Sequence, residues 1–526
     1  MLFNSVEFLL LYLPIVALIF YCLIFLSFSN RIVISFLVCA SLFFYGFWNP
    51  VYLLLILSSI LLNFTFSNLI SKYHLISDKF SLFLLVFGIA VNLIILGYFK
   101  YVNFFIETLS ILNNNSFEAL NVILPLAISF FTFQQIAYLV DIYRREAEVV
   151  SILDYSLFVC FFPQLIAGPI VHHRDIIWQF HAVFKKNKMI WQNLSVGIVF
   201  ITIGLFKKIF LAEKMSFWSD RVFNSLYLGI EPSFIEAWVG TLCFTLQIYF
   251  DFSAYSDIAI GLAILFGIKL PLNFYSPYKA ISIIDFWKLW HVSLSSFLKN
   301  YLYIPLGGNK NGTIRRYLNL LIVMILGGLW HGAGLNFMLW GTLHGFYLMI
   351  NHFWRTLTLK NLKNSKTSTI KKICYQLLTF LAVSLAWVLF RTVSIEEAFI
   401  MYKGLIGLNG IVLPTHYFTL LGDFGGFAQK LGIKSGAVQL YGGGWQIIWI
   451  FSLLLFVWIM PNTQQIMYQF KPSINFEKFY KKPPKITSWI VWNPSLLSAL
   501  SIAGIMMWLI IELLQGASGE FIYFQF

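Results

Sequence analysis

The sequence predicts an all-α, polytopic membrane protein. Hydrophobic residues make up 59% of its 526 positions and charged residues only 11%, whereas a soluble domain carries roughly 25% charged residues. Apolar runs recur along the whole chain, and most approach or exceed the roughly 20 residues that cross about 30 Å of hydrocarbon as a helix. Backbone groups at that depth must be bonded within their own segment, so we expect these spans to be helical.

Helices are predicted wherever an apolar run is long enough: 7–27, 32–48, 50–70, 80–99, 120–140, 151–168, 193–212, 236–262, 317–354, 373–392, 443–461 and 486–512. The first run lacks a basic leader and a small-residue cleavage site, so we interpret it as a retained helix. The uncharged run 317–354 is too long for one helix and contains several glycines, so it is predicted to be a broken or paired helix. Pro414 to Gly444 is interpreted as a glycine-rich loop, and residues 1–526 as a single domain.

The net charge of +14 indicates sidedness rather than nucleic-acid binding. Basic residues cluster in short stretches between apolar runs, as the positive-inside rule expects of cytoplasmic loops; the clusters lie at 185–188, 360–372 and 471–485. One crossing by 486–512 would then place the tail 513–526 outside the cytoplasm. This tail ends in an aromatic hexapeptide, 521–526, that we expect to fold back onto the protein or to lie at the interface, since disordered tails are normally polar.

Three clusters contain residues suited to chemistry, because ionisable groups within membrane segments are costly and are candidates for function. His331 lies in Gly-Gly-Leu-Trp-His-Gly-Ala, where glycines allow close approach of a backbone or a ligand and an imidazole can serve as a base. His291 ends Asp-Phe-Trp-Lys-Leu-Trp-His, within a predicted amphipathic interfacial helix over 283–303. Asp251 and Asp257 end an apolar helix and are expected to bond loop amides or basic side chains.

Other polar residues receive structural predictions. His344 is expected to pack between helices or lie at the interface, and Asp141 with its neighbours Tyr143, Arg144 and Arg145 to form an interface anchor. The five cysteines are scattered singly, so neither a disulfide framework nor a metal site is predicted. The sequence contains no GxSxG, HExxH, phosphate-loop or dinucleotide motif, which leaves the hydrolase, zinc protease, ATPase and dehydrogenase classes without their usual signatures.

These residues resemble the membrane-bound O-acyltransferase (MBOAT) family, and within it the bacterial alginate O-acetylase and peptidoglycan O-acetyltransferase branch. The likeness covers nearly the whole chain and is strongest in the two histidine motifs; the similar segments are Met1–Ser5, Leu124–Gln134, Phe162–Pro169, Asp251–Asp257, Phe286–His291, Tyr301–Asn309 and Gly328–Ala333. The resemblance implies a ring of about 10–13 tilted transmembrane and re-entrant helices around a central tunnel. It further implies an enzyme of the bacterial inner (cytoplasmic) membrane.

By the same resemblance His331 matches the catalytic histidine and His291 the second signature position. Tyr523 matches the tyrosine of an extracytoplasmic C-terminal motif proposed as an acyl relay. Trp330, Trp290, Tyr301 and Asn336, in or beside these motifs, are predicted to contact substrate.

The expected reaction uses a cytoplasmic acetyl thioester, acetyl-CoA, with no metal. His331 would act as a base on a hydroxyl, and His291 would orient the thioester or stabilise the oxyanion. The phenol of Tyr523, with a reference pKa near 10, would need such a base. The expected partners are the lipid bilayer, an SGNH-type acetyltransferase outside the membrane and a polysaccharide acceptor, with no nucleic acid. The abundance of Lys, Asn, Ile and Phe suggests an AT-rich genome and favours peptidoglycan or another surface glycan over alginate.

Two other classes remain open. A polysaccharide or proton-coupled transporter also places broken helices near the midplane, but it predicts inverted repeats, which are not evident. A non-catalytic scaffold of a polymer synthase complex is the other alternative. Capture of labelled acetyl groups would separate both from an enzyme.

Overall fold

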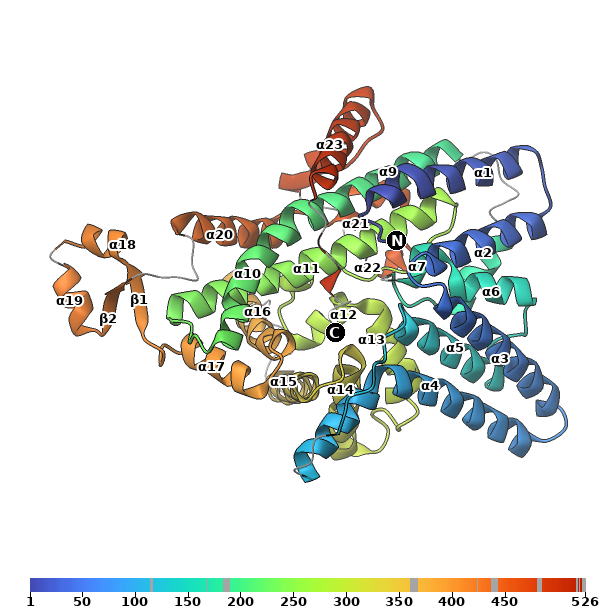
Figure 1. Ribbon diagram of the computed structural model, residues 1–526, viewed down its shortest axis with the longest axis horizontal. Coiled ribbons are helices and arrows are strands. Elements are labelled where there is room, and N and C mark those ends of the chain that lie inside the picture. The colour runs from blue at the N-terminus through green and yellow to red at the C-terminus, as the bar shows by residue number, and fades with distance from the viewer. Residues whose placement is uncertain are drawn as a thin grey trace.

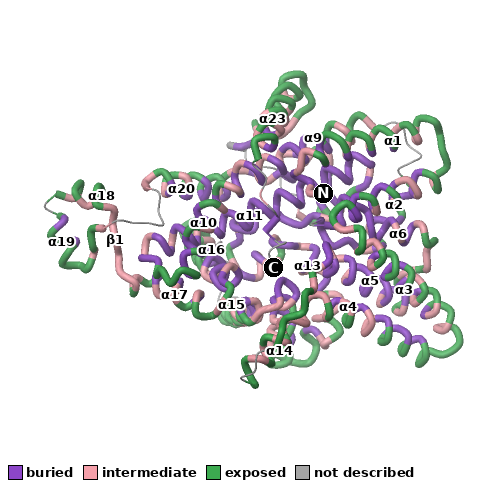
Figure 2. Tube along the Cα trace, in the orientation of Figure 1, coloured by how far each residue is buried: buried purple, intermediate pink, exposed green. Residues whose placement is uncertain are grey.

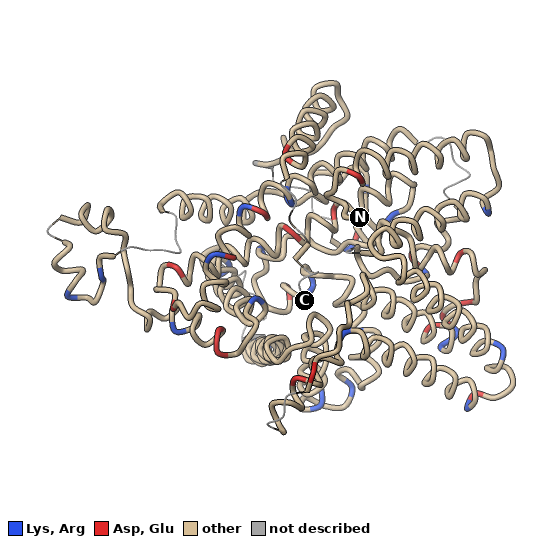
Figure 3. The backbone as a smooth tube through the Cα atoms, in the orientation of Figure 1, with Lys and Arg blue, Asp and Glu red and all other residues tan. Residues whose placement is uncertain are grey.

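The computed structural model describes residues 1–113, 117–166, 168–182, 190–359, 368–422, 424–436, 443–479, 485–516, 519, 521 and 522. Among these, eight helices are long and apolar enough to cross a membrane: Phe8–Phe25, Val51–His74, Asp78–Asn113, Ile190–Leu228, Phe234–Leu265, Gly312–His331, Thr369–Arg391 and Leu496–Leu514. The all-α, polytopic class predicted from the sequence is confirmed. Figure 3 shows that long stretches of helix have no charged residue.

The first part of the chain forms one group of helices (Figure 1). They are η1 (Phe8–Tyr12), α1 (Leu13–Phe25), α2 (Asn30–Gly46), α3 (Val51–His74), α4 (Asp78–Asn113), α5 (Ile128–Tyr143), α6 (Ile152–Cys160), α7 (Phe162–Leu165) and α8 (His173–Ala182). A continuous helical rod follows, made of α9 (Ile190–Phe206), the π-helical turn η4 (Lys207–Ala212) and α10 (Glu213–Ser225). The short helix η5 (Leu226–Leu228) ends it.

The central helix is α11 (Phe234–Leu265), whose apolar window is entirely buried (Figure 2). It packs along α9 and α10 and also contacts η4, α16, α17 and α20. A helix that is apolar all round belongs inside a larger helical assembly rather than facing lipid. Residues of α11 are therefore well placed to support an internal site.

The site region and the last part of the chain comprise η6 (Pro277–Lys279), α12 (Ile283–Leu289), α13 (Val292–Leu298), η7 (Lys299–Tyr303), α14 (Gly312–His331), α15 (Leu335–Leu359), α16 (Thr369–Arg391) and α17 (Ile395–Leu405). After them come α18 (Thr415–Leu420), α19 (Phe424–Lys430), α20 (Gly444–Ile459), α21 (Thr463–Ile466), η8 (Tyr468–Phe470), α22 (Phe476–Phe479), η9 (Lys485–Ile490) and α23 (Leu496–Leu514). Helices α14 and α15 pack against each other as a hairpin. The predicted break in 317–354 is thereby confirmed, at residues 332–334.

The predicted loop Pro414 to Gly444 is wrong in part. It contains α18 and α19, and strands β1 (Ile411–Pro414) and β2 (Ile433–Gly436) pair in parallel, with Ile411 opposite Ile433. These elements form a small lobe that projects from the helical body (Figure 1). The β propensity lies mainly in β1, which contains Ile411 and Val412, whereas β2 contributes only Ile433.

Several predicted boundaries also differ. Helix α5 begins at Ile128 rather than at 120, because Ala127 has a left-handed backbone conformation. The predicted helix 151–168 divides at Phe161, two residues before Pro163, whose missing N–H cannot extend the helical ladder. The predicted helix 486–512 begins at Leu496, where the Ser495 side chain caps the first turn.

Candidate active site

The glycines around His331 bring α14 and α15 into backbone contact. A Cβ atom on Gly328 would lie 2.1 Å from the carbonyl oxygen of Phe337 on α15, and one on Gly341 would lie 2.2 Å from that of Met324 on α14. Small residues at helix crossings allow this approach in membranes. The sequence predicted that the glycines admit either a neighbouring backbone or a ligand, and at Gly328 it is a neighbouring backbone that approaches. The hairpin fixes His331 at the last residue of α14.

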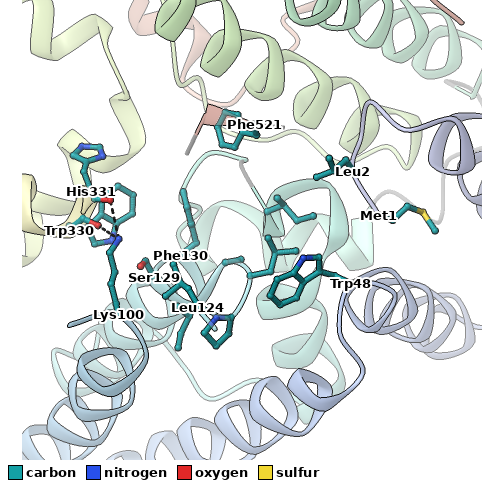
Figure 4. Close-up of a pocket in the computed structure, with 15 residues that line it drawn as sticks. Met1, Leu2, Trp48, Lys100, Leu124, Ser129, Phe130, Trp330, His331 and Phe521 are labelled. Atoms are coloured by element: carbon teal, nitrogen blue, oxygen red, sulfur yellow. Dashed lines mark hydrogen bonds between the residues drawn. The ribbon is translucent and has the colours of Figure 1, made fainter. Parts of the chain in front are cut away.

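The last carbonyl groups of α14 receive hydrogen bonds from α4. Lys100 Nζ donates to the carbonyl oxygens of Trp330 (2.6 Å) and His331 (3.1 Å), and the Tyr101 hydroxyl donates to that of Leu329 (2.7 Å). The final carbonyls of a helix lack partners within the helix, and a cation is favourable at that end. This Lys100 clamp, shown in Figure 4, holds the backbone that bears the imidazole.

His291 lies at a break between two short helices, so the predicted amphipathic helix over 283–303 is wrong. Helix α12 ends at Leu289, Trp290 is extended, and His291 is left-handed with φ of 41°. The neighbouring segment stabilises the break, because Val292 N donates to the carbonyl oxygen of Asn273 (3.0 Å) and Tyr275 N donates to that of Leu289 (3.0 Å). A non-glycine residue in this conformation costs on the order of 1–3 kcal/mol, and such strain clusters at functional sites.

Asn273 determines which nitrogen of His291 carries the proton. Its Oδ1 lies 3.0 Å from His291 Nδ1 and also accepts from the Ser293 hydroxyl (3.0 Å) and amide (3.4 Å). An amide oxygen only accepts, so Nδ1 is the donor and, in the neutral ring, Nε2 is left with its lone pair. His291 Nε2 is buried and has no hydrogen-bond partner among the described residues.

The two histidines meet although they lie on separate elements. Their ring centroids are 6.4 Å apart, and Trp330 contacts both rings, at 5.9 Å from His291 and 5.0 Å from His331. Both imidazoles are buried, His291 completely and His331 to 4% exposure. The arrangement brings two titratable rings together inside the membrane domain, where either one alone would be a packing residue.

A cavity of about 300 Å³ reaches His331. Its lining includes Lys100, the segment before α5, the N-terminus and Phe521 of the C-terminal tail. Figure 4 draws the lining residues as sticks: Met1, Leu2, Trp48, Lys100, Leu124, Pro125, Leu126, Ala127, Ile128, Ser129, Phe130, Ile166, Trp330, His331 and Phe521. The lining is mostly apolar with a few polar groups, as small-molecule sites are. This cavity reaches His331 from one side; the predicted passage to the opposite side stays a prediction.

The other predicted substrate residues lie elsewhere, apart from Trp330, which lines the cavity. Trp290 is buried against Trp387, with ring centroids 5.0 Å apart. Asn336 Nδ2 donates to the carbonyl oxygen of Thr392 (2.8 Å), which gives it a structural hydrogen bond. The Tyr301 hydroxyl donates to Asp141 (2.8 Å). Tyr523 lies outside the described residues.

The carboxylates have structural partners, as predicted for Asp251 and Asp257. Both lie inside α11 rather than at its end; Asp251 pairs with Lys208 at 3.0 Å and Asp257 pairs with Lys207. Asp141 is buried, so it does not itself serve as an interface anchor; for its neighbours Tyr143, Arg144 and Arg145 that role stays a prediction. The Asp141 carboxylate instead accepts from Tyr301 and lies 3.4 Å from Arg174. The predicted packing role of His344 is confirmed, since the ring is buried and accepts from Trp287 Nε1 (3.3 Å).

Two residues of the site were missed in the sequence. The predicted helix 80–99 ends one residue before Lys100, but α4 continues to Asn113, which places the lysine within a membrane-spanning helix. An ionisable residue so placed is a functional candidate by default, and this signal was available. Asn273 gave no such signal, because an asparagine in a loop is common and its partner is distant in sequence.

An acyltransferase is the class that this site fits: a helical membrane domain with a buried histidine that lines a cavity and a second histidine beside it. The chain belongs to the membrane-bound O-acyltransferase family, whose model matches residues 143–392. It is therefore a multi-pass membrane acyltransferase, as the sequence predicted.

Individual relatives support the assignment. The chain is 44% identical to the peptidoglycan O-acetyltransferase of Helicobacter pylori over 403 residues, 72% of this chain and 74% of the relative. It is 36% identical to the probable alginate O-acetylase of Pseudomonas aeruginosa over 415 residues, 78% of this chain and 75% of the relative. The teichoic acid D-alanyltransferase of Streptococcus thermophilus is 25% identical over 237 residues, 44% of this chain and 57% of the relative.

Proposed function

We propose that this chain transfers acetyl groups from acetyl-CoA in the cytoplasm, through the inner membrane, for O-acetylation of a polysaccharide outside. The observation that carries the proposal is that His331 lines a cavity and that its ring centroid lies 6.4 Å from that of His291. The relatives named as O-acetyltransferases, at 44% and 36% identity, support the acetyl group and the glycan acceptor. The higher identity to the peptidoglycan enzyme favours peptidoglycan over an alginate-like polymer.

In this proposal His331 takes the proton of an attacking hydroxyl. The oxygen forms a bond to the acetyl carbon, the carbon–sulfur bond of the thioester breaks, and the proton passes to the departing thiolate. A positioned base is worth about 10²- to 10⁴-fold in rate. The Lys100 clamp contributes by fixing the backbone of the base, since proton transfer requires hydrogen-bond reach.

The geometry refines the role expected for His291. In the neutral ring Nε2 is an acceptor, so it cannot donate to an oxyanion and is suited to orient a hydroxyl instead. Trp330 is the candidate donor, because its indole Nε1 is buried and has no hydrogen-bond partner among the described residues. One well-placed donor to a developing oxyanion contributes about 10²- to 10³-fold.

The positions of basic residues support a cavity that opens away from the cytoplasm. Arg315 and Arg316 lie at the beginning of α14, and Arg355 lies near the end of α15. All three are at the ends of the hairpin remote from His331. By the positive-inside rule these ends face the cytoplasm, so His331 and the cavity lie toward the other compartment.

The tail provides the acceptor hydroxyl in this proposal. Phe521 lines the cavity of His331, two residues before Tyr523. We propose that Tyr523 receives the acetyl group as a phenyl ester and passes it to an SGNH-type transferase outside the membrane. A phenolate leaves more readily than an alkoxide, so the ester remains a good donor.

Labelled acetyl-CoA tests the proposal on the purified chain. Without an acceptor we expect label on the wild-type protein, and mass spectrometry of the C-terminal peptide should find it on Tyr523. His331→Gln should abolish labelling while acetyl-CoA binding persists. The matched control is His344→Gln, a buried histidine of the same hairpin whose partner Trp287 can still donate to glutamine; it should retain labelling.

Each result decides between classes. Label in His331→Gln would show that the base is another residue. Absence of label from a folded wild-type chain that binds acetyl-CoA would remove the covalent relay. Absence of both label and binding would favour a transporter or a scaffold. Tyr523→Phe should abolish polymer acetylation in cells, and unchanged acetylation would remove the relay alone.

A further inference from the structure

The described residues of the C-terminal tail are bonded to the core at a second cluster outside the catalytic cavity. Asn4 Nδ2 donates to the carbonyl oxygen of Gly519 (3.1 Å), although the two residues are 515 positions apart. The backbone N–H of Ile522 donates to Asp251 Oδ2 (2.8 Å). The ring of Phe521 lies 4.1 Å from that of Tyr255, and the side chains of Phe521 and Ile522 are both buried.

The groups that receive the tail are held by partners of their own. Asp251 pairs with Lys208 (3.0 Å), and Lys208 also pairs with Glu213 (2.9 Å). The side chains of Asp251 and Lys208 are each 3% exposed. The Tyr255 hydroxyl donates to Asn4 Oδ1 (2.9 Å), which directs the amide nitrogen of Asn4 toward Gly519. Side chains fixed in this way bind with little loss of entropy.

Gly519 contributes shape as well as a carbonyl group. A Cβ atom at this position would lie 2.2 Å from a carboxylate oxygen of Glu213. The tail therefore passes directly against the ion-paired carboxylate, and a side chain larger than hydrogen would push it away. Both ends of the contact, Gly519 and Ile522, also line a polar cavity of about 210 Å³ with Lys208 and Asp251.

A similar ion pair on the same helices has a different partner. Asp257 lies one and a half turns further along α11 and pairs with Lys207, beside Lys208. Its carboxylate accepts from the Thr463 hydroxyl (2.6 Å) in α21. The two pairs share their chemistry, although Lys207 is more exposed (16%) than Lys208 (3%), and it is Asp251 that accepts from the backbone N–H of Ile522. This difference provides an internal control.

We infer that Lys208, Asp251, Asn4 and Tyr255 form a clamp that positions the C-terminal tail for acyl transfer. They are positioning residues, since they hold the tail at Gly519, Phe521 and Ile522 and do not touch the reacting atoms. Phe521 connects the clamp to the site, because it packs on Tyr255 and also lines the cavity of His331. The chain after Ile522 therefore starts from a fixed point beside the catalytic cavity.

The consequence for catalysis rests on the proposed function. A free tail would reach the base at an effective concentration on the order of millimolar, whereas a tail fixed one residue before Tyr523 confines the phenol to a smaller volume and raises its effective concentration. Loss of orientation of this kind costs about 10²-fold in rate. We expect release of the clamp to lower polymer acetylation by about 10- to 100-fold and to leave acetyl-CoA binding unchanged.

Ile522→Pro tests the hydrogen bond of the clamp, because proline has no N–H to donate to Asp251. Its control is Ile522→Ala, which keeps the N–H. Each purified full-length variant is treated with carboxypeptidase Y, which also releases proline, and the trimmed mass is measured. Digestion should stop short of Ile522 in the wild type and the alanine variant, and should pass Gly519 in the proline variant. Acetylation should fall in the proline variant only.

Core variants complete the test. Asp251→Ala should free the tail for trimming, whereas Asp257→Ala should leave the tail protected, even if both substitutions lower the stability of the protein. If Asp251→Ala does not fold, trimming of the Ile522→Pro variant tests the clamp instead. A protected tail in both Ile522→Pro and Asp251→Ala would overturn the clamp. A freed tail with unchanged acetylation would overturn its positioning role. The trimming result does not depend on the hydroxyl of Tyr523. If Tyr523→Phe left acetylation unchanged and so removed the relay, trimming would still show whether the clamp holds the tail.

Discussion

Gly328→Ala should inactivate the enzyme while leaving most of the membrane domain intact. The methyl group would lie 2.1 Å from the carbonyl oxygen of Phe337, which is a backbone atom and cannot rotate away. Contacts of a Cβ atom below 3.0 Å essentially do not occur. Helices α14 and α15 must therefore separate by about 0.9 Å at this point, three residues before His331.

The magnitude follows from the position of the strain. The Lys100 clamp holds the end of α14 from the side of α4, so a displaced hairpin moves the imidazole relative to the cavity. A misplacement of about 1 Å in a catalytic group costs about 10²-fold in rate. Overpacking adds a loss of about 1–3 kcal/mol in stability, which a protein of this size with many packed helices tolerates.

The assay measures base-released acetate from purified polymer in cells that produce each variant at matched levels. Gly97→Ala is the control, because it lies in α4 near Lys100 and its Cβ would meet no atom within 4 Å. We expect about 1% of wild-type acetylation for Gly328→Ala and full acetylation for Gly97→Ala. Full acetylation in Gly328→Ala would refute the conclusion that close packing of the hairpin places the base.

Two further predictions concern the groups that orient the histidines. Lys100→Met should lower acetylation by about 10- to 100-fold, because the last carbonyl groups of α14 lose a charged donor. Lys79→Met, which replaces an exposed lysine near the beginning of α4, should match the wild type, and an equal loss in both variants would refute the role of the Lys100 clamp. Asn273→Leu should lower kcat about 10-fold with little change in KM for acetyl-CoA, since it removes the acceptor that orients His291. Ser256→Ala should have a smaller effect on kcat, because it removes only the hydroxyl that accepts from the amide nitrogen of Asn273. An unchanged kcat in Asn273→Leu would show that the tautomer of His291 is irrelevant.

The composition and the long uncharged runs were enough to predict a helical membrane protein. The hydrocarbon core of a membrane offers no water to the backbone, so a chain with so few charges and such long apolar runs must form its backbone hydrogen bonds within helices. The break in 317–354 was predicted for the same kind of reason, because its length exceeds one span and glycines interrupt it. His331 was identified because it is ionisable and lies among them.

Tertiary structure decided how these parts meet. The His291 break, the orientation of its ring by Asn273 and the Lys100 clamp on α14 depend on contacts between distant segments, and Lys100 bonds a residue 230 positions away. Local patterns report only which face of a helix is apolar. They do not report which loop crosses that face, so they assigned His291 to a continuous helix.

The tail shows the same division. Its aromatic composition predicted that it would fold back, and the burial of Phe521 and Ile522 confirms this for those two residues. Its attachment to Asp251 and Asn4 was not predictable, because a backbone N–H and a glycine carbonyl have no sequence signature. Amino-acid identity determined what had to be buried, and only the packed structure determined which polar partners were available there.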